Sequence, residues 1–342
     1  MTEAFGELMP RPVVVAPMAG GPSTPELVKA ASAAGALGFL AAGYKTAAAM
    51  RAEMDAVAAS GPFGVNVFVP GTPAPDPGAV RSYLATLAAE AGELGVAPGE
   101  PSWDDDSWDA KIDTLLAHPP PVVSFTFGCP DPGVVAALQA AGSVVWVTVT
   151  EPQEAALAAA RGANGLCVQG AGAGAHRGTF SDRPDGSGGP PGRPLPELLR
   201  DVAAVTGLPL VAAGGIMSQQ DAAAAMAAGA TAVQCGTAFL RCPESGAHPR
   251  HKAALADPRF SHTAVTRAFS GRPARALVNR FVLDHPAAPS AYPEINNATR
   301  PLRAAAGASG DVGRMSLYAG EGFRAATTRP AAEIVELLSP GS

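Results

Sequence analysis

The chain has 342 residues, 47% of them hydrophobic, and a net charge of −6 at pH 7. This charge argues against nucleic acid as the main partner, and no window approaches the roughly eighteen apolar residues of a membrane span. The start, MTEAFGELMPRP, lacks a signal-peptide pattern, and the four cysteines lie far apart. We therefore expect a cytoplasmic protein with reduced thiols.

Short apolar runs alternate along the chain with alanine-rich stretches that open on Ser, Thr, Asp or Pro and close on Gly. The runs begin at Val13, Leu37, Phe63, Val122, Val144, Gly165, Leu208 and Thr231. Strands that alternate with helices indicate a parallel sheet, and eight of them predict a (β/α)8 TIM barrel in the α/β class. A doubly wound sheet is the weaker alternative, because MAGGPS after the first strand lacks its GxGxxG fingerprint.

Three segments interrupt this alternation. Residues 95–110 are an acidic insertion, whose Asp104–Asp106 run we expect to be a solvated turn. Residues 181–194 have almost no apolar content and form either a mobile lid or a tolerated insertion. The strand pattern stops after Leu240. We therefore divide the chain into a barrel, residues 1–240, and a smaller, mainly helical region, residues 241–342, packed over the active-site end.

Glycines follow the last two predicted strands. Gly214 and Gly215 come after the seventh strand, and QCGT, residues 234–237, ends the eighth. Barrels commonly bind phosphate between these two loops, where backbone N–H groups and helix N-termini stabilise an anion. The glycines could instead serve only tight turns, but their joint position favours a phosphate-bearing cofactor.

The sixth predicted strand leads into QGAGAGAHRGTF, residues 169–180. Its glycines allow the backbone to approach a flat ligand closely. The amides of Gln169 and of Asn66, in the third strand, suit the edge of a heteroaromatic ring. His176 follows the glycines, and an imidazole with an ordinary pKa of about 6.5 suits a general base. The alternative is a surface or structural histidine.

Two further groups of side chains carry weaker signals. Cys242, His248 and His251 lack a complete set of four ligands, so we expect no metal site. Residues 269–281, FSGRPARALVNRF, carry three arginines that form either a phosphate clamp or the solvated face of a helix.

Together these motifs resemble the nitronate monooxygenases, FMN enzymes once called 2-nitropropane dioxygenases, in their class I bacterial branch. The matching segments run in order over nearly the whole chain: APMAGGPSTPELVKAASAAGALGFLAAGY, FGVNVFVP, VVSFTFG, QGAGAGAHRGTF, VAAGGI, AVQCGTAFL, TRAFSGRPAR and YPEINNATRPLR. The resemblance implies that FMN is held by Met18, Asn66, Gln169, Gly174, Gly214, Gly215, Gln234, Cys235, Gly236 and Thr237.

The resemblance also implies an activity. Alkyl nitronates, and neutral nitroalkanes as a second substrate class, would be oxidised by dioxygen to carbonyl compounds and nitrite. His176 would be the base, and Tyr292 would face the substrate. One alternative is an FMN-dependent NAD(P)H reductase of an enoyl thioester or a quinone on the same barrel. Another is a non-catalytic flavin- or phosphate-binding barrel. The HRGTF continuation favours the first activity.

The histidine loop departs from the family pattern at two positions. The family loop usually reads Gln-Gly-x-Glu-Ala-Gly-Gly-His, whereas this chain has Gly172 for the glutamate and Ala175 for the last glycine. We expect the lost carboxylate to change how the loop is anchored, or the orientation and pKa of His176. The methyl of Ala175 lies where the backbone would need a positive φ.

Overall fold

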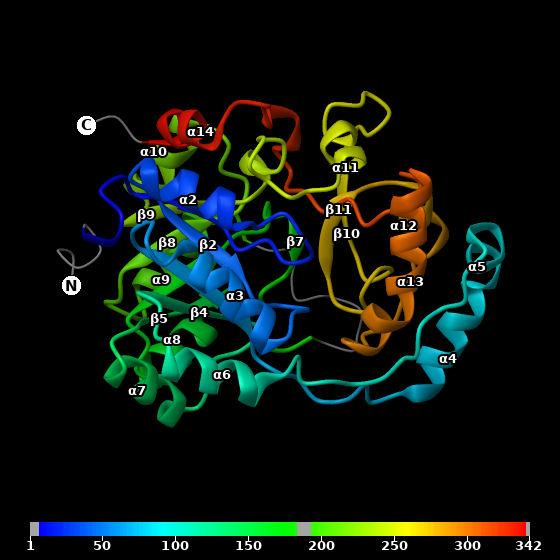
Figure 1. Ribbon diagram of the computed structural model, residues 1–342, viewed down its shortest axis with the longest axis horizontal. Helices are drawn as coiled ribbons and strands as arrows, with labels where there is room; N and C mark the ends of the chain where they lie inside the picture. The colour runs from blue at the N-terminus through cyan, green and yellow to red at the C-terminus, as the bar shows by residue number, and fades with distance from the viewer. Residues whose placement is uncertain (1–6, 183–192, 340–342) are drawn as a thin grey trace.

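Eight parallel strands form a closed barrel in the computed structural model, which describes residues 7–182 and 193–339 (Figure 1). The strands follow one another round the barrel in chain order, except that β7 is not part of it. They are β1 Val13–Val15, β2 Leu37–Ala41, β3 Phe63–Phe68, β4 Val122–Thr126, β5 Val144–Val149, β6 Gly165–Gln169, β8 Leu210–Ala213 and β9 Ala232–Cys235. The predicted (β/α)8 barrel is confirmed, with one strand from each apolar run.

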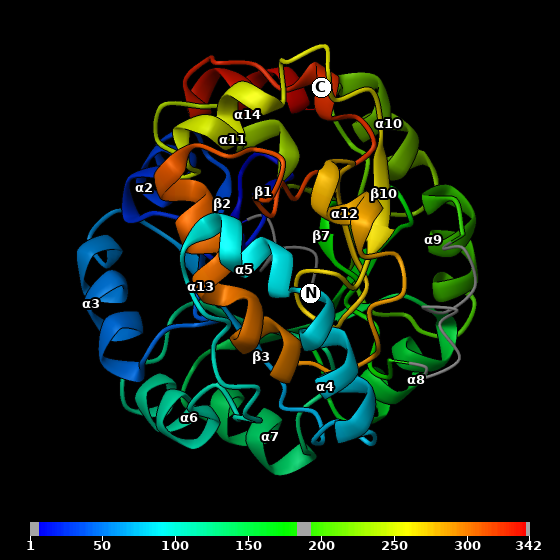
Figure 2. The same cartoon turned by 90° about the vertical axis from the view of Figure 1, so that its right-hand side faces the viewer.

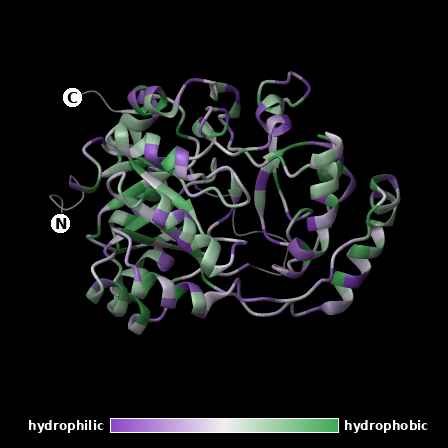
Figure 3. Cartoon of the chain, in the orientation of Figure 1, coloured by the Kyte–Doolittle hydropathy of each residue, from purple (hydrophilic) through white to green (hydrophobic). Residues whose placement is uncertain are grey.

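The barrel strands are continuous apolar runs because parallel strands are covered on both faces. Trp146 of β5 is fully buried, and its ring lies 5.7 Å from that of Phe39 in β2. Val14, Val122 and Val211 belong to the same cluster, which fills the inside of the barrel. Figure 3 shows these apolar strands at the centre and more hydrophilic segments in the helices around them.

The helices that connect the barrel strands form a ring around them (Figure 2). Hydroxyl side chains start several of them: Thr24 and Thr46 each accept a backbone N–H three residues on, and Ser218 forms a capping box with Asp221. These helices are α2 Pro25–Ala33, α3 Ala47–Val57, α6 Trp108–Ala117, α7 Pro132–Ala140, α8 Pro152–Ala160, α9 Leu195–Ala203 and α10 Gln219–Ala227.

A second layer, here called the cap, covers one end of the barrel (Figure 1). Two of its helices, α4 Pro77–Thr86 and α5 Ala88–Leu94, come from the connection between β3 and β4 and pack against α13. The remaining cap helices come from the C-terminal part of the chain: α11 Pro249–Ala254, α12 Arg280–Asp284 and α13 Glu294–Ser309. Short 3-10 turns, η1 Thr237–Phe239 and η2 Phe323–Ala325, link this part to the barrel.

The cap also contains a small antiparallel sheet in the order β10, β11, β7. Its strands are β10 Thr263–Thr266, β11 Ala274–Leu277 and β7 Ala175–His176. The expectation that the strand pattern ends at Leu240 is therefore wrong. These strands are short, and β10 is only half-buried, so no continuous apolar run marks them. Because Ala274 of β11 pairs with His176, this sheet joins the histidine loop to the cap.

The last helix, α14 Ala331–Leu338, returns to the barrel wall and packs against α2 and α10. The division of the chain at residues 240 and 241 stays an interpretation. Residues 183–192, most of the segment expected to be a lid or an insertion, lie outside the described residues. No helix in the described ranges is long and apolar enough to cross a membrane.

Candidate functional site

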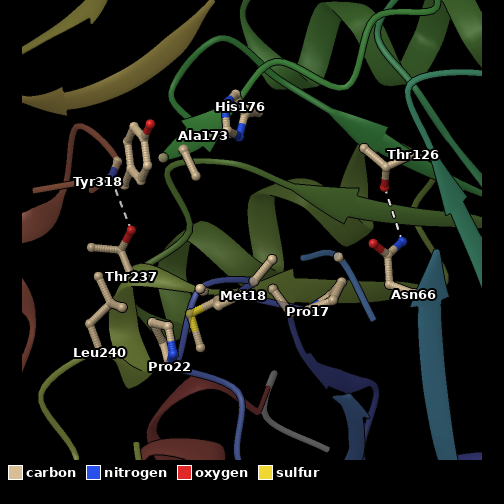
Figure 4. A pocket seen from close by; sticks show the side chains of 18 of the residues that line it. Pro17, Met18, Pro22, Asn66, Thr126, Ala173, His176, Thr237, Leu240 and Tyr318 are labelled. Atoms are coloured by element: carbon tan, nitrogen blue, oxygen red, sulfur yellow. Dashed lines mark hydrogen bonds between the residues drawn. The ribbon is translucent and has the colours of Figure 1, made fainter. Parts of the chain in front are cut away.

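A cavity of about 610 Å³ lies between the carboxyl ends of the barrel strands and the cap. Its walls come from the segments that follow β1, β2, β4, β6, β8 and β9, and from α13. All residues predicted to bind the cofactor line it, as does His176, whereas Tyr292 is not among the lining residues. In Figure 4, His176 lies on one side of the cavity and Met18 on the other, with Asn66 and Thr126 at one end.

The glycine turns after β8 and β9 form one end of the cavity. Gly214 and Gly215 have φ angles of 107° and 78°, in the left-handed region that side chains disfavour. Gly236 lies beside Met18, and Thr237 accepts a hydrogen bond from the Gly320 N–H at 2.9 Å. These turns bring backbone, without side chains, against the cavity, which fits a bound phosphate group.

The two amides predicted to read a ring edge have different roles in the structure. Asn66 is buried, and its Nδ2 donates to the Ser124 hydroxyl at 2.9 Å and to the Thr126 hydroxyl at 3.0 Å. Its carbonyl oxygen therefore remains the group that can meet a ligand. Gln169 instead closes the histidine loop, because its amide donates to the His176 carbonyl and accepts the Gly178 N–H.

The histidine loop is held by charged groups at several points. Arg177 donates to the carbonyls of Gln169 and Gly170, and Arg275 of β11 donates to the Ala171 carbonyl. Arg275 also forms an ion pair with Glu321 at 3.0 Å. Charge-assisted hydrogen bonds of this kind are the stronger ones in proteins. The glycine-rich loop is thus fixed in place although its own sequence is flexible.

The two departures from the family loop have visible consequences. Ala175 has a φ of 59°, which confirms the expected left-handed backbone and places a methyl group in a conformation that glycine adopts more easily. A Cβ atom on Gly172 would lie 3.2 Å from the Glu321 carboxylate. A carboxylate from the cap therefore lies beside the position where this loop has glycine.

The far end of the loop is anchored by Glu154 at the start of α8. This buried carboxylate accepts the Phe180 N–H at 2.6 Å and the Thr179 hydroxyl at 3.0 Å on one oxygen. Its other oxygen accepts the N–H and the hydroxyl of Thr150. One side chain thus ties the end of the histidine loop to the end of β5.

We predict that Glu154→Gln lowers the free energy of unfolding by about 2–3 kcal/mol, because the amide NH2 would face donors that the carboxylate accepts. Urea denaturation of both proteins measures this change. Glu197→Gln is the matched control, since Glu197 is an exposed carboxylate in the first turn of α9. Equal effects of the two substitutions would show that Glu154 is not an anchor.

His176 is half-buried in a positively charged environment. Burial lowers the pKa of its imidazolium from 6.5 to about 3, and the nearby charges of Arg272 and Arg303 act in the same direction. Its Nε2 lies 2.8 Å from the hydroxyl of Ser270, which is itself buried. The imidazole is therefore neutral at physiological pH and oriented by a hydroxyl group.

Aromatic rings surround His176. The rings of Phe127, Tyr292 and Tyr318 have centroids 5.4–5.8 Å from the imidazole. Tyr292, predicted to face the substrate, stands beside the histidine, and its hydroxyl donates to the hydroxyl of Tyr44, which lines the cavity.

Sequence reasoning missed Tyr44, Phe127, Ser270 and Tyr318. Tyr44 and Phe127 lie within three residues of the ends of β2 and β4, so the rule that located the other residues, namely the carboxyl ends of strands, could have found them. Ser270 and Tyr318 come from the cap, and no local pattern marks them.

The charge of the cavity lining is positive. Arg300 and Arg303 of α13 and Lys45 after β2 contribute to it, whereas no Asp or Glu occurs among the described residues that line the cavity. Lys45 is paired with Glu53 at 2.6 Å. The remaining positive charge favours an anionic ligand.

Of the three arginines of residues 269–281, only Arg280 lies on a solvated helix face. Arg272 is buried, and its guanidinium lies 4.0 Å from the centroid of the Phe127 ring and donates to the Thr179 carbonyl. Arg275 lies in β11 and holds the histidine loop, and only Arg280 lies in a helix, α12. The contacts of Arg272 and Arg275 therefore support neither a phosphate clamp nor a solvated helix face. Both side chains hold the loop after β6.

Comparisons with known proteins agree with this architecture. The sequence model of the nitronate monooxygenase family matches residues 3–341. A nitronate monooxygenase from Pseudomonas aeruginosa is 40% identical over 99% of this chain and 98% of its own length. The solved structure of a nitroalkane oxidase from Streptomyces ansochromogenes superposes with a TM-score of 0.94 at 50% identity, covering 98% of this chain and 96% of the other. The M276A variant of FabK from Thermotoga maritima has a TM-score of 0.72 at 25% identity, covering 99% and 94%.

Proposed function

The chain belongs to the nitronate monooxygenase family, a family of flavin-dependent oxidoreductases, and on that premise we propose that it uses FMN and dioxygen to oxidise alkyl nitronates to carbonyl compounds and nitrite. The observation that carries this proposal is the neutral, half-buried His176 at a cavity whose described lining has cationic and no acidic side chains. Such a cavity is matched to a planar organic anion.

The residues around the cavity fit FMN. The phosphate would lie at the backbone turns of Gly214–Gly215 and Gly236–Thr237, and the isoalloxazine ring would lie between Met18 and the histidine loop, with its edge toward Asn66. FMN would supply the acceptor for the electrons of the nitronate, which then pass to dioxygen. The chain itself binds and orients the substrate and moves its proton.

The contacts of Ser270 support one assignment of the proton on the His176 ring. In the arrangement that we propose, the Ser270 hydroxyl donates to the Arg272 carbonyl at 3.2 Å and its oxygen accepts the Nε2–H of the imidazole at 2.8 Å. We therefore assign the ring proton to Nε2 and the acceptor role to Nδ1. A proton from the α-carbon of a nitroalkane would go to Nδ1.

The low pKa of His176 favours preformed nitronates over neutral nitroalkanes. A general base works best when its pKa is near the working pH, and a value of about 3 makes the imidazole a weak proton acceptor. A nitronate has already lost its proton and needs only hydrogen bonds and positive charge. We infer that nitronates are the better substrates and that neutral nitroalkanes react slowly.

The test is an oxygen-electrode assay of the FMN-loaded protein with propyl-1-nitronate under air, combined with a nitrite assay. We expect oxygen consumption and nitrite release without any NAD(P)H. Oxidation of NAD(P)H without nitrite would instead support a reductase on this barrel. Tight FMN binding with neither reaction would support a non-catalytic flavin-binding protein.

A further inference from the structure

The acidic run of residues 104–106 is a solvated turn only in part: Asp104 is exposed, whereas Asp106 points inward. Asp106 forms an ion pair with Lys111 of α6, whose side chain is completely buried, at 2.7 Å between Oδ2 and Nζ. The other carboxylate oxygen of Asp106 accepts the backbone N–H of Tyr44 at 3.0 Å. Lysine side chains are rarely buried completely, and burying this ion pair costs desolvation free energy. We therefore looked for what the pair holds in place.

The ion pair holds a residue of the cavity wall in an unusual conformation. Tyr44 has a φ of 66°, a left-handed backbone that costs free energy for any residue with a side chain. The hydrogen bond from its N–H to Asp106 fixes that backbone, and its ring packs edge-on against Phe68 with centroids 5.6 Å apart. The ring of Tyr44 is thereby directed to the cavity that it lines.

The hydroxyl of Tyr44 has a proton to donate. Tyr292 donates its own hydroxyl proton to the Tyr44 oxygen, at 3.3 Å. The Tyr44 proton is therefore left for an acceptor in the cavity, and donation from Tyr292 strengthens it as a donor. Burial raises the pKa of Tyr44 well above its usual range, so the group stays a phenol.

We propose that Tyr44 is a substrate-binding residue that donates its phenolic hydrogen to an oxygen of the nitronate, and that Asp106 and Lys111 are positioning residues for it. This inference rests on the proposed function for the identity of the anion. It gives the acidic insertion between β3 and β4 a role at the site, because this segment brings a charge pair to the loop after β2.

The direct variant is Tyr44→Phe, which removes one oxygen and keeps the ring. The KM for propyl-1-nitronate is expected to rise about tenfold with a smaller change in kcat, because one hydrogen bond to an anion is lost. Asp106→Asn and Lys111→Met each leave a buried partner group alone and are expected to raise KM to a similar extent. Added to Tyr44→Phe, Asp106→Asn should raise KM no further, since Asp106 acts on the substrate only through the position of the Tyr44 hydroxyl.

A rescue and a control separate positioning from stability. The double variant Asp106→Asn/Lys111→Met has no buried charge, and its amide oxygen can still accept the Tyr44 N–H, so KM should return to near the wild-type value. Glu90→Gln breaks another buried pair, Glu90 with His285 at 3.2 Å, in the outer part of the cap. It should lower stability and leave KM unchanged. An Asp106→Asn variant that behaves in this same way would overturn the positioning role.

Binding of butyrate tests Tyr44 without turnover. Butyrate is an unreactive carboxylate with the size and charge of propyl-1-nitronate, and its binding can be followed through the visible absorption of the FMN-loaded protein. We expect Tyr44→Phe to weaken butyrate binding about tenfold. Equal affinity in wild type and variant would overturn the inference. Failure of the wild type to release nitrite would refute the proposed function instead, while Tyr44-dependent butyrate binding would still support an anion-binding phenol.

Discussion

His176→Asn is expected to reduce kcat/KM for neutral nitroalkanes by about 10²-fold, the low end of the usual contribution of general acid–base catalysis because the imidazole is a weak base, and to leave FMN bound. Asparagine keeps a polar side chain near Ser270 but cannot take a proton. For preformed nitronates the loss should stay within about tenfold, because no proton needs to be moved. Steady-state kinetics with 1-nitropropane and with propyl-1-nitronate, measured side by side, gives kcat/KM for the two substrates.

The low pKa of His176 also predicts how kcat/KM depends on pH. A lowered pKa means that the proton leaves at lower pH, so a group with a pKa of about 3 is neutral throughout the range from pH 5 to pH 8. The wild-type kcat/KM for nitronates should therefore show no ionisation of this histidine in that range. An inflection near pH 6.5 that disappears in His176→Asn would contradict the assignment.

The matched control is His248→Asn. His248 is an exposed histidine at the N-cap of α11, and asparagine is a good N-cap residue. Its replacement should leave the kinetics with both substrates unchanged. If nitroalkanes and nitronates lose activity equally in His176→Asn, His176 binds the substrate and is not a base.

The barrel could be predicted from the sequence because its signals are local. Each strand is an apolar run such as VVWVTV, each connecting helix has its own start residue, and the strand order follows from the alternation. The carboxyl ends of parallel strands lie at the same end of a barrel, so the residues after each strand could be assigned to one site. This rule placed His176 and the two glycine turns in the lining of the cavity, which Asn66, inside β3, shares.

The cap could not be predicted in the same way, because its contacts join distant parts of the chain. Asp106 looks like a surface residue in the run DDD, and its partner Tyr44 lies 62 residues earlier. Ser270 contacts His176 from 94 residues away and lies in the turn between β10 and β11, where no periodic pattern marks it. Burial of these polar groups is decided by tertiary packing, on which local sequence carries no information.

One property of the loop after β6 could be predicted from the sequence and another could not. The positive φ at Ala175 followed from the position of a glycine in the family pattern, and it is present. The rigidity of the loop did not follow, because its own residues are glycine and alanine. It comes from Arg177, Arg275 and Glu154, which act on the carbonyls, hydroxyl and N–H groups of the loop.

Gly214→Ala is expected to weaken FMN binding by about 10–100-fold. Gly214 has a φ of 107°, and strain of this kind costs about 1–3 kcal/mol for other residues, where each 1.4 kcal/mol corresponds to about tenfold in affinity. An added Cβ would also lie 2.9 Å from the backbone nitrogen of Ala173 and 3.0 Å from the Gly170 carbonyl oxygen. The methyl group would therefore disturb both the cofactor turn and the histidine loop.

Gly207→Ala is the control for this change. Gly207 precedes the same strand, β8, and a Cβ there meets no atom within 4 Å. Quenching of FMN fluorescence on titration with apoprotein gives the Kd of each variant, and urea denaturation of the apoproteins shows whether the turn has affected folding. A Gly214→Ala apoprotein that is as stable as wild type but binds FMN weakly would locate the effect in the cofactor turn. Unchanged FMN affinity in that variant would mean that the phosphate lies elsewhere in the cavity, because no bound phosphate at this turn could tolerate the displaced backbone.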